Sequence, residues 1–300
     1  MNSSNRNTYT NYALGFCWHP CLSGAVILAF ALFVSGTAVA QEFRIESSVY
    51  DDSSKLPISQ TTTLFSQSVV YDFQLSNDAQ PRVLEIAIYD SRRQMMILLD
   101  TQRRMKLELS DLRLLKIEDA MRRQTLEDNR SSFLVKDEFE QDIDWSTNWV
   151  TLTSPQIEYR FKGGQPANVA IIPAYTQFLD NFTRLNVTDP TKYPPFARMK
   201  VNQSIKRLGW IPDEVRISVK QNSLFRKPFS AKSKHVLVTQ LSKGDHSRIA
   251  MAKQHWMQFE SVDLTEYRGL PENPRFKLPK VSVASHEEPI QGNNSSRKRN

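Results

Sequence analysis

The stretch RVLEIAIYDSRRQMMILLDTQRRMKLELS, residues 82–110, decides the fold of this 300-residue chain. Three apolar runs are separated by the polar connections SRRQ and TQRR, and the last run alternates strictly between apolar and polar residues. Asp90 and Asp100 each end a run, and an aspartate carboxylate favours a turn by accepting hydrogen bonds from the backbone that follows it. A catalytic role for the two aspartates is the alternative. Period-two patterning joined by short connections is typical of an antiparallel meander.

Strand-like segments continue towards the amino terminus, and helices and further strands follow the stretch. Ser110 is a helix cap, Pro173 and the pair Pro194-Pro195 open helices, and Asp245 is expected to cap the last helix. Gly163-Gly164 is expected to make a turn. Further strands are predicted over 149–152, 157–161, 215–220 and 234–241. This order predicts an α+β fold in which an antiparallel β-meander is accompanied by helices.

The first 40 residues carry the three parts of a secretory signal peptide. Arg6 lies in a polar leader without acidic residues, Gly24–Val34 is apolar throughout, and the small residues of Ala38–Ala40 precede the expected cut. The apolar run is shorter than the roughly 20 residues that cross a bilayer. An uncleaved anchor that also takes in Phe16–Cys21 is the alternative. We expect cleavage after Ala40 and export to the periplasm or the extracellular space.

Composition narrows the function of the exported chain. Both cysteines, Cys17 and Cys21, lie in the leader, so the mature chain has no thiol for a disulfide or a thiolate metal site. Without Arg6, 38 of the 39 basic residues remain against 32 acidic ones, a net charge of +6. This mild excess permits contact with an anionic membrane or envelope polymer, and an exported protein rarely meets nucleic acid. We expect one domain over 41–270 and a disordered tail over 271–300.

The sequence contains no recognised catalytic or metal-binding motif. His246 and His255 are nine residues apart, which places them on different faces of a helix, and the patterns of zinc proteases, serine hydrolases, phosphate loops and dinucleotide sites are absent. The acidic stretch 137–144 has no glycine for a calcium loop and is expected to be a solvated connection. We therefore expect a protein that is not an enzyme and holds no cofactor or metal.

A basic segment between residues 216 and 243 is a candidate contact surface. It holds seven lysines and arginines and no acid, and Leu224, Phe225 and Phe229 lie between its two predicted strands. A basic hairpin with an apolar tip suits an anionic membrane surface or an acidic partner. The alternative is a solvated hairpin whose tip packs on the core. The candidate contact residues are Arg216, Lys220, Phe225, Arg226, Lys227 and Phe229.

The order of elements resembles exported bacterial proteins of the LolA/LolB type. The resemblance rests on the stretch DSRRQMMILLDTQRR, residues 90–104, and covers most of residues 42–268. Two further segments, PPFARM at Pro194–Met199 and FxxVDLTEYR at Phe259–Arg268, look like those of secreted planctomycete proteins. The resemblance implies an antiparallel β-meander that forms an open half-barrel, covered by helices, whose concave apolar face holds a lipid or an acyl chain.

These expectations lead to an exported binding protein for lipid or lipoprotein acyl chains. The candidate cavity lining is Val70, Leu84, Ile86, Ile88, Met96, Leu98 and Leu107. The first alternative is a structural or adaptor protein of the cell envelope, with a filled core and no ligand. The second is a hydrolase of envelope polymers, which requires polar residues that converge at the mouth of a deep pocket.

Overall fold

Twelve strands form one sheet in the computed structural model, which describes residues 42–51, 54–189, 192–220 and 228–270. The strands are β1 (Phe43–Asp51), β2 (Ser59–Ser66), β3 (Val69–Leu75), β4 (Val83–Asp90), β5 (Met95–Asp100), β6 (Met105–Ser110), β7 (Glu140–Asp144), β8 (Trp149–Thr153), β9 (Ile157–Gly164), β10 (Ile211–Val219), β11 (Phe229–Val238) and β12 (Glu260–Ser261). Their spatial order is β12-β6-β5-β4-β3-β2-β1-β11-β10-β9-β8-β7. Pairing is antiparallel throughout the meander, and the short β12 pairs parallel to β6. The predicted α+β class and the large antiparallel sheet are confirmed, and β12 and β7 are its two open edges.

The two connections inside the stretch 82–110 have the same backbone conformation. Asp90 Oδ1 accepts hydrogen bonds from the N–H groups two and three residues further on, at 3.0 and 3.1 Å. Asp100 Oδ1 does the same at 2.9 and 2.8 Å. Each connection ends on a left-handed residue, Gln94 with φ 50° and Arg104 with φ 58°. Both aspartates are turn formers, and the turns fix the register of β4, β5 and β6.

Local capping explains where the helices begin and end. They are α1 (Asp111–Glu127), α2 (Phe133–Lys136), α3 (Ile172–Arg184), α4 (Phe196–Leu208), α5 (Lys243–Gln258) and α6 (Leu264–Arg268). Ser110 caps α1, as predicted, and α4 ends at Gly209, whose φ of 64° suits glycine. The prediction for α5 was wrong in detail, because Ser242 is the cap. Asp245 completes a capping box by accepting a hydrogen bond from the Ser242 N–H at 2.8 Å.

Two segments differ from the prediction. Gly163 and Gly164 do not form a turn but end β9, paired with the start of β10. A Cβ atom on Gly163 would lie 2.4 Å from the carbonyl oxygen of Ile211, so this close approach of two strands requires glycine. The acidic stretch 137–144 is more than a connection, because most of it forms the edge strand β7. Charged side chains on an edge strand hinder its pairing with another chain.

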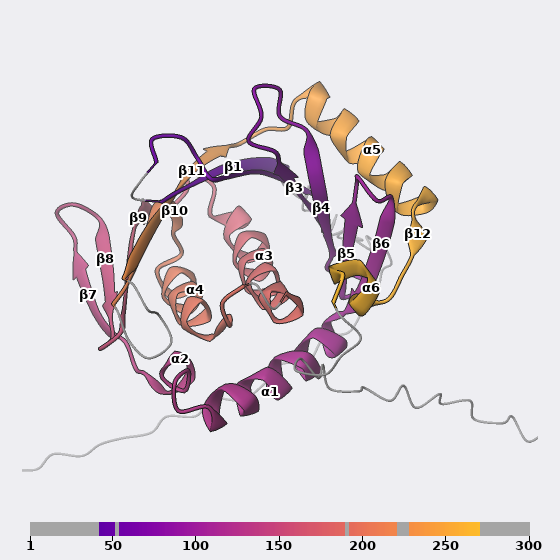
Figure 1. The fold of residues 1–300 in the computed structure, drawn as a ribbon. Helices are drawn as coiled ribbons and strands as arrows, with labels where there is room; N and C mark the ends of the chain where they lie inside the picture. Colours follow the sequence, from indigo (N-terminus) through magenta and orange to yellow (C-terminus); the bar gives the residue numbers. More distant parts are fainter. Residues whose placement is uncertain (1–41, 52–53, 190–191, 221–227, 271–300) are drawn as a thin grey trace, which may run out of the picture. The chain divides into compact units, whose positions relative to one another are not determined.

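Each face of the sheet has its own apolar core, because successive side chains of a strand point to opposite faces. On the inner face, the sheet curves around α3 and α4, and α1 packs against α3 (Figure 1). On the outer face, Tyr71, Ile88 and Ile97 of the meander pack with Ile249 and Ala252 of α5. We call the buried apolar residues on the side of α3 and α4 the inner core, and those on the side of α5 the outer core.

Three expectations concern segments outside the described residues: the signal peptide of residues 1–40, the tail of residues 271–300 and the hairpin tip at 221–227. Within the described ranges, none of the helices has the length and apolar character needed to cross a bilayer.

Candidate functional site

The seven residues predicted to line one cavity do not share one face of the sheet. Four of them belong to the inner core: Val70, Met96, Leu98 and Leu107. Two belong to the outer core: Ile86 and Ile88. Leu84 is half-buried. The prediction of a single lining was wrong for Ile86 and Ile88. Residues 86–89 are all apolar or aromatic, so the sequence does not reveal that Ala87 and Tyr89 are the ones that point inward.

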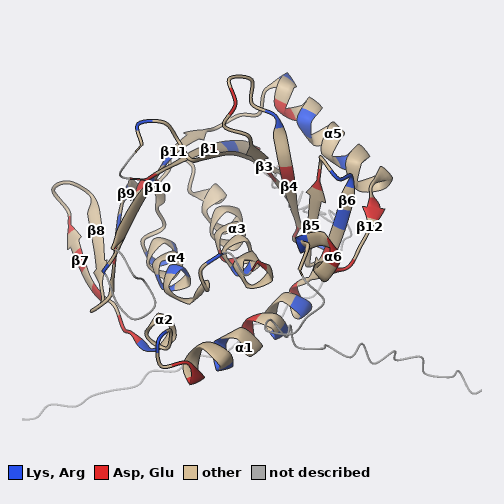
Figure 2. Ribbon diagram, viewed as in Figure 1, with Lys and Arg blue, Asp and Glu red and all other residues tan. Residues whose placement is uncertain are grey.

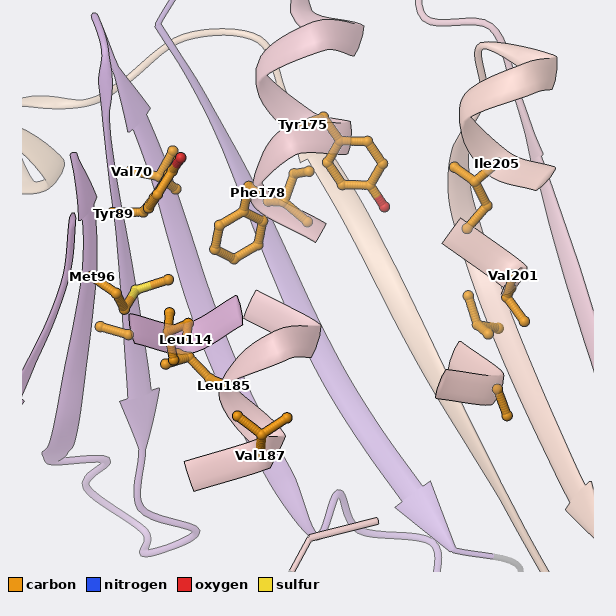
Figure 3. Packing of buried hydrophobic residues seen from close by; sticks show 14 of the residues in the cluster. Val70, Tyr89, Met96, Leu114, Tyr175, Phe178, Leu185, Val187, Val201 and Ile205 are labelled. Carbon is orange, nitrogen blue, oxygen red and sulfur yellow. The ribbon is translucent and has the colours of Figure 1, made fainter. Parts of the chain in front are cut away.

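Side chains from the helices fill the inner face. The ring of Phe178 in α3 packs edge-on against Phe65 with ring centres 5.5 Å apart, and Phe65 stacks on Phe43 at 4.0 Å. Figure 3 shows Val70 and Met96 of the sheet in the same cluster as Phe178. The four predicted residues of the inner core are at most 7% exposed, and none of them lines a cavity described below. Protein atoms therefore occupy the inner face where a ligand was expected.

A cleft of about 590 Å³ opens on the other side of the sheet, between α5 and the ends of the strands that it covers. Four of its lining residues are apolar or aromatic: Val69, Tyr71, Trp256 and Met257. Three others are basic: Arg93, Lys106 and Lys253. Ser66, Gln67 and Asp90 complete the lining. We call this cavity the α5 cleft; it is the one with the most apolar walls among the cavities described here.

Trp256 is held in the α5 cleft by three contacts. Its indole N–H donates a hydrogen bond to Glu108 Oε1 at 2.7 Å, and Lys106 Nζ donates to its backbone carbonyl at 3.0 Å. The guanidinium of Arg93 lies 5.4 Å from the centre of its ring. Met257 is 77% exposed. Because neighbouring residues of a helix point to different sides, Trp256 packs on the sheet while Met257 leaves an apolar surface open to solvent.

The charges of the α5 cleft are predominantly positive. Arg93 Nε lies 3.6 Å from Oδ2 of the buried Asp90, whose Oδ1 binds the turn. Burial, together with the nearby Asp90 carboxylate, raises the pKa of Tyr71 to about 12, so the Tyr71 hydroxyl is neutral at physiological pH. Arg93, Lys106 and Lys253 therefore face a single carboxylate in the lining. An apolar wall beside such an excess of cations suits a ligand with an apolar tail and an anionic head.

A second cavity, of about 460 Å³, lies between α1 and α3, and its polar groups bind one another. The Tyr89 hydroxyl donates to Asp111 Oδ2 at 3.0 Å and accepts from Gln177 Nε2 at 3.2 Å. Burial, reinforced by the Asp111 carboxylate, raises the pKa of Tyr89 to about 12. These internal hydrogen bonds connect the helices to the sheet, and we assign them a structural role.

The predicted contact residues of the basic hairpin are separated in the structure. Arg216 and Lys220 are exposed. Phe229 is half-buried, packs against the inner core and stacks on Tyr193 with ring centres 5.6 Å apart. The remaining three lie outside the described residues: Phe225, Arg226 and Lys227. The packing of Phe229 agrees with the alternative in which the tip packs on the core, and its contact with a membrane or partner stays a prediction.

Sequence patterns alone did not identify the α5 cleft. Helical spacing assigns Trp256 to the buried face of its helix, and the adjacent Met257 is the one local signal, because two large apolar neighbours cannot both face the same core. The contact between Lys106 and Trp256 joins residues 150 positions apart. No local periodicity predicts such a pairing.

No protein-family model matches the chain, and a search of curated proteins also gives no match. The resemblance to the LolA/LolB type therefore stays a prediction.

Proposed function

We propose that this protein is an exported, non-enzymatic binding protein for an anionic amphiphile, such as a fatty acid or another lipid with an acyl chain, and that it holds the ligand in the α5 cleft. The observation that carries the proposal is the composition of that cleft, where Trp256 and Met257 adjoin Arg93, Lys106 and Lys253. In this proposal the sheet is an open half-barrel with a packed interior. Export rests on the leader pattern of residues 1–40.

The size of the α5 cleft supports this class of ligand. Its volume of about 590 Å³ lies within the roughly 300–1,000 Å³ of small-molecule sites. Each methylene group removed from water contributes about 0.8 kcal/mol, so six methylenes against the apolar wall contribute on the order of 5 kcal/mol. The basic side chains are near solvent, where an ion pair contributes at most about 1 kcal/mol. The apolar tail therefore supplies most of the affinity, and the cations orient the head.

The proposed place of binding differs from the concave face that the sequence resemblance implies. The rings of Phe178 and Phe182 lie 5.0 Å apart on α3, and Phe178 packs on the sheet. A ligand on the inner face would have to displace this helix, whereas the α5 cleft is already open to solvent.

Titration of the mature protein, residues 41–300, with tetradecanoate tests the proposal by calorimetry. We expect saturable binding of one molecule. Binding is expected to be at least tenfold weaker after Met257→Glu, which places a charge beside the apolar tail, and after Lys253→Glu, which places a negative charge beside the anionic head. Leu112→Glu on α1 is the matched control, since Leu112 is also an exposed apolar helix residue, 63% exposed. Absence of binding to the unchanged protein, or equal losses in all three variants, contradicts the proposal.

A second candidate is a structural or adaptor protein of the cell envelope that binds no small ligand. The filled inner face favours it, since a packed core is what that function requires. The titration separates the two candidates. If the protein is an adaptor without a ligand, the folded protein does not bind tetradecanoate.

A further inference from the structure

A row of three basic side chains crosses the outer face of β9, β10 and β11. Arg216 lies directly opposite Arg160 of β9 on one side and directly opposite Lys232 of β11 on the other. Side chains in such positions have Cβ atoms about 4.5–5.5 Å apart, and like charges placed there destabilise a sheet. We call these three residues the basic row. Its repulsion is relieved when an anion lies between the cations.

Two aromatic rings hold the basic row in place. The guanidinium groups of Arg160 and Arg216 lie 4.9 and 4.8 Å from the centre of the Trp149 ring. Lys232 Nζ lies 5.8 Å from the centre of the Tyr50 ring, and these two residues are directly opposite in the β1–β11 pair. A guanidinium stacked on a ring keeps its N–H donors in its own plane, where they remain available to an oxyanion.

The basic row lines a cavity of about 290 Å³ that also contains the hydroxyl groups of Ser218 and Ser230. These two serines are directly opposite each other in the β10–β11 pair. The Nε atom of Arg160 is buried and has no hydrogen-bond partner among the described residues. A buried donor without an acceptor is unfavourable, so an anion oxygen that reached this atom would satisfy it.

Acidic residues neutralise only part of this charge. Glu158 lines the same cavity, and Glu214 Oε1 lies 2.5 Å from Arg216 Nε. The exposed Lys162 and Lys234 are both paired with Glu214 across the strands. The five bases at and beside the cavity (Arg160, Lys162, Arg216, Lys232 and Lys234) thus outnumber the acids Glu158 and Glu214 by three. The further acids of this face, Glu140, Asp142 and Asp144, lie on the edge strand β7, beyond β8. Figure 2 shows that β9 and β10 lie apart from α5, which covers the other half of the sheet.

We propose that the basic row binds a phosphate group, carried either by a soluble phosphate ester or by a lipid headgroup. Two guanidinium groups offer paired N–H donors that match phosphate oxygens, and the ammonium of Lys232 and the hydroxyl groups of Ser218 and Ser230 add further donors. A phosphate dianion also offsets more of the excess charge than a carboxylate does. This site is independent of the α5 cleft, and its proposal does not rest on fatty-acid binding.

Calorimetric titration of the mature protein with glycerol 3-phosphate and with inorganic phosphate tests the site for soluble ligands. Cosedimentation with phosphatidylcholine vesicles, with and without phosphatidic acid, tests it for a lipid headgroup. The variant Arg160→Gln/Arg216→Gln removes two of the three cations, and Lys232→Gln removes the third without changing the Trp149 stack. The control is Arg113→Gln/Lys116→Gln, which removes the same two charges from exposed positions of α1.

We expect at least tenfold weaker binding of the responsive probe by the Arg160→Gln/Arg216→Gln and Lys232→Gln variants, and unchanged binding by the control. A response to the soluble phosphates identifies a soluble ester as the ligand; a response to phosphatidic acid alone identifies a headgroup. Loss of equal size in the control, or no binding of any phosphate probe by the unchanged protein, overturns the proposal. Tetradecanoate uptake by the Arg160→Gln/Arg216→Gln variant is expected to be normal, so failure of this site and failure of the α5 cleft are distinguishable.

Discussion

The guanidinium of Arg93 lies 5.4 Å from the centre of the Trp256 ring. Arg93 lies in the β4–β5 turn, whose conformation is fixed by hydrogen bonds to Asp90. Trp256 lies in the final turn of α5. A cation and an apolar ring from distant parts of the chain thus meet in the α5 cleft. A stacked pair of this kind contributes about 0.5–1 kcal/mol near the surface, so its main effect is to position the two groups.

Replacement of Arg93 by glutamine is expected to weaken tetradecanoate binding about three- to tenfold. The change removes one cation from the lining and leaves Trp256 less restrained. Arg92→Gln is the control, because Arg92 is an exposed neighbour of equal charge that does not line the cleft. Titration calorimetry of both variants measures the difference. Similar affinities for the two variants would contradict the role given to Arg93.

Removal of the Glu118 carboxylate is expected to destabilise the fold strongly. Glu118 is buried on α1 and accepts from Arg184 Nε of α3 at 2.6 Å and from Arg122 at 3.1 Å. Without it, the mostly buried Arg184 loses its carboxylate partner, a loss of about 3–5 kcal/mol. Urea denaturation of Glu118→Ala measures the free energy of unfolding. Asp128→Asn, which breaks an exposed pair with Arg130, is expected to change that free energy by less than about 1 kcal/mol.

Two titrating groups of the sheet have opposite effects on stability between about pH 4 and pH 6.5. Burial lowers the pKa of His235 from 6.5 to about 4, so protonation favours the unfolded chain and stability rises with pH in this range. Burial raises the pKa of Asp72 from 3.8 to about 7, although the Thr63 hydroxyl that donates to it acts in the opposite sense. Asp72 is therefore protonated in the folded state alone, and its contribution to stability falls as the pH rises.

The two pH dependences of the free energy of unfolding are expected to cancel in the unchanged protein. Each is expected to appear when the other group is replaced. Each group changes the free energy of unfolding by about 1.4 kcal/mol per pH unit in the range where it is protonated in only one of the folded and unfolded states. The free energy of unfolding of Asp72→Asn is expected to rise between pH 4 and pH 6.5, and that of His235→Gln to fall. Denaturation midpoints at several pH values measure both. Parallel profiles for the two variants would show that these groups titrate normally.

Gly163→Ala is expected to destabilise the pairing of β9 with β10 by about 2 kcal/mol or more, because the added Cβ atom would lie 2.4 Å from the carbonyl oxygen of Ile211 and strand backbone has little freedom to move away. Gly164→Ala is the control, since a Cβ atom there would have no neighbour within 4 Å among the described residues. Thermal denaturation of the two variants compares them directly. An equal shift in melting temperature would contradict the close approach.

The sequence predicts local features of this fold better than long-range ones. The meander and its turns were predictable because Asp90 and Asp100 act on their own neighbours, and because the period of two is visible within each strand. The sequence does not predict which face of the sheet Ile86 and Ile88 occupy, because their strand is apolar on both sides. The helix that covers the outer face lies far along the chain. The α5 cleft is not predictable for the same reason, because α5 and the strands that it covers are far apart in the sequence. Likewise, cross-strand register brings Arg160 beside Arg216, and no spacing within either strand indicates it.

Photo-crosslinking of the protein, prepared as residues 41–300, with a fatty acid that carries a diazirine on its tail tests the central claim most directly. Peptide mass spectrometry then locates the attached ligand. The proposed function predicts labelling of Lys253–Met257 on α5 and of the facing residues Val69 and Tyr71, and suppression of that labelling by excess tetradecanoate. Labelling concentrated on α3 around Phe178, or none that tetradecanoate suppresses, would contradict it.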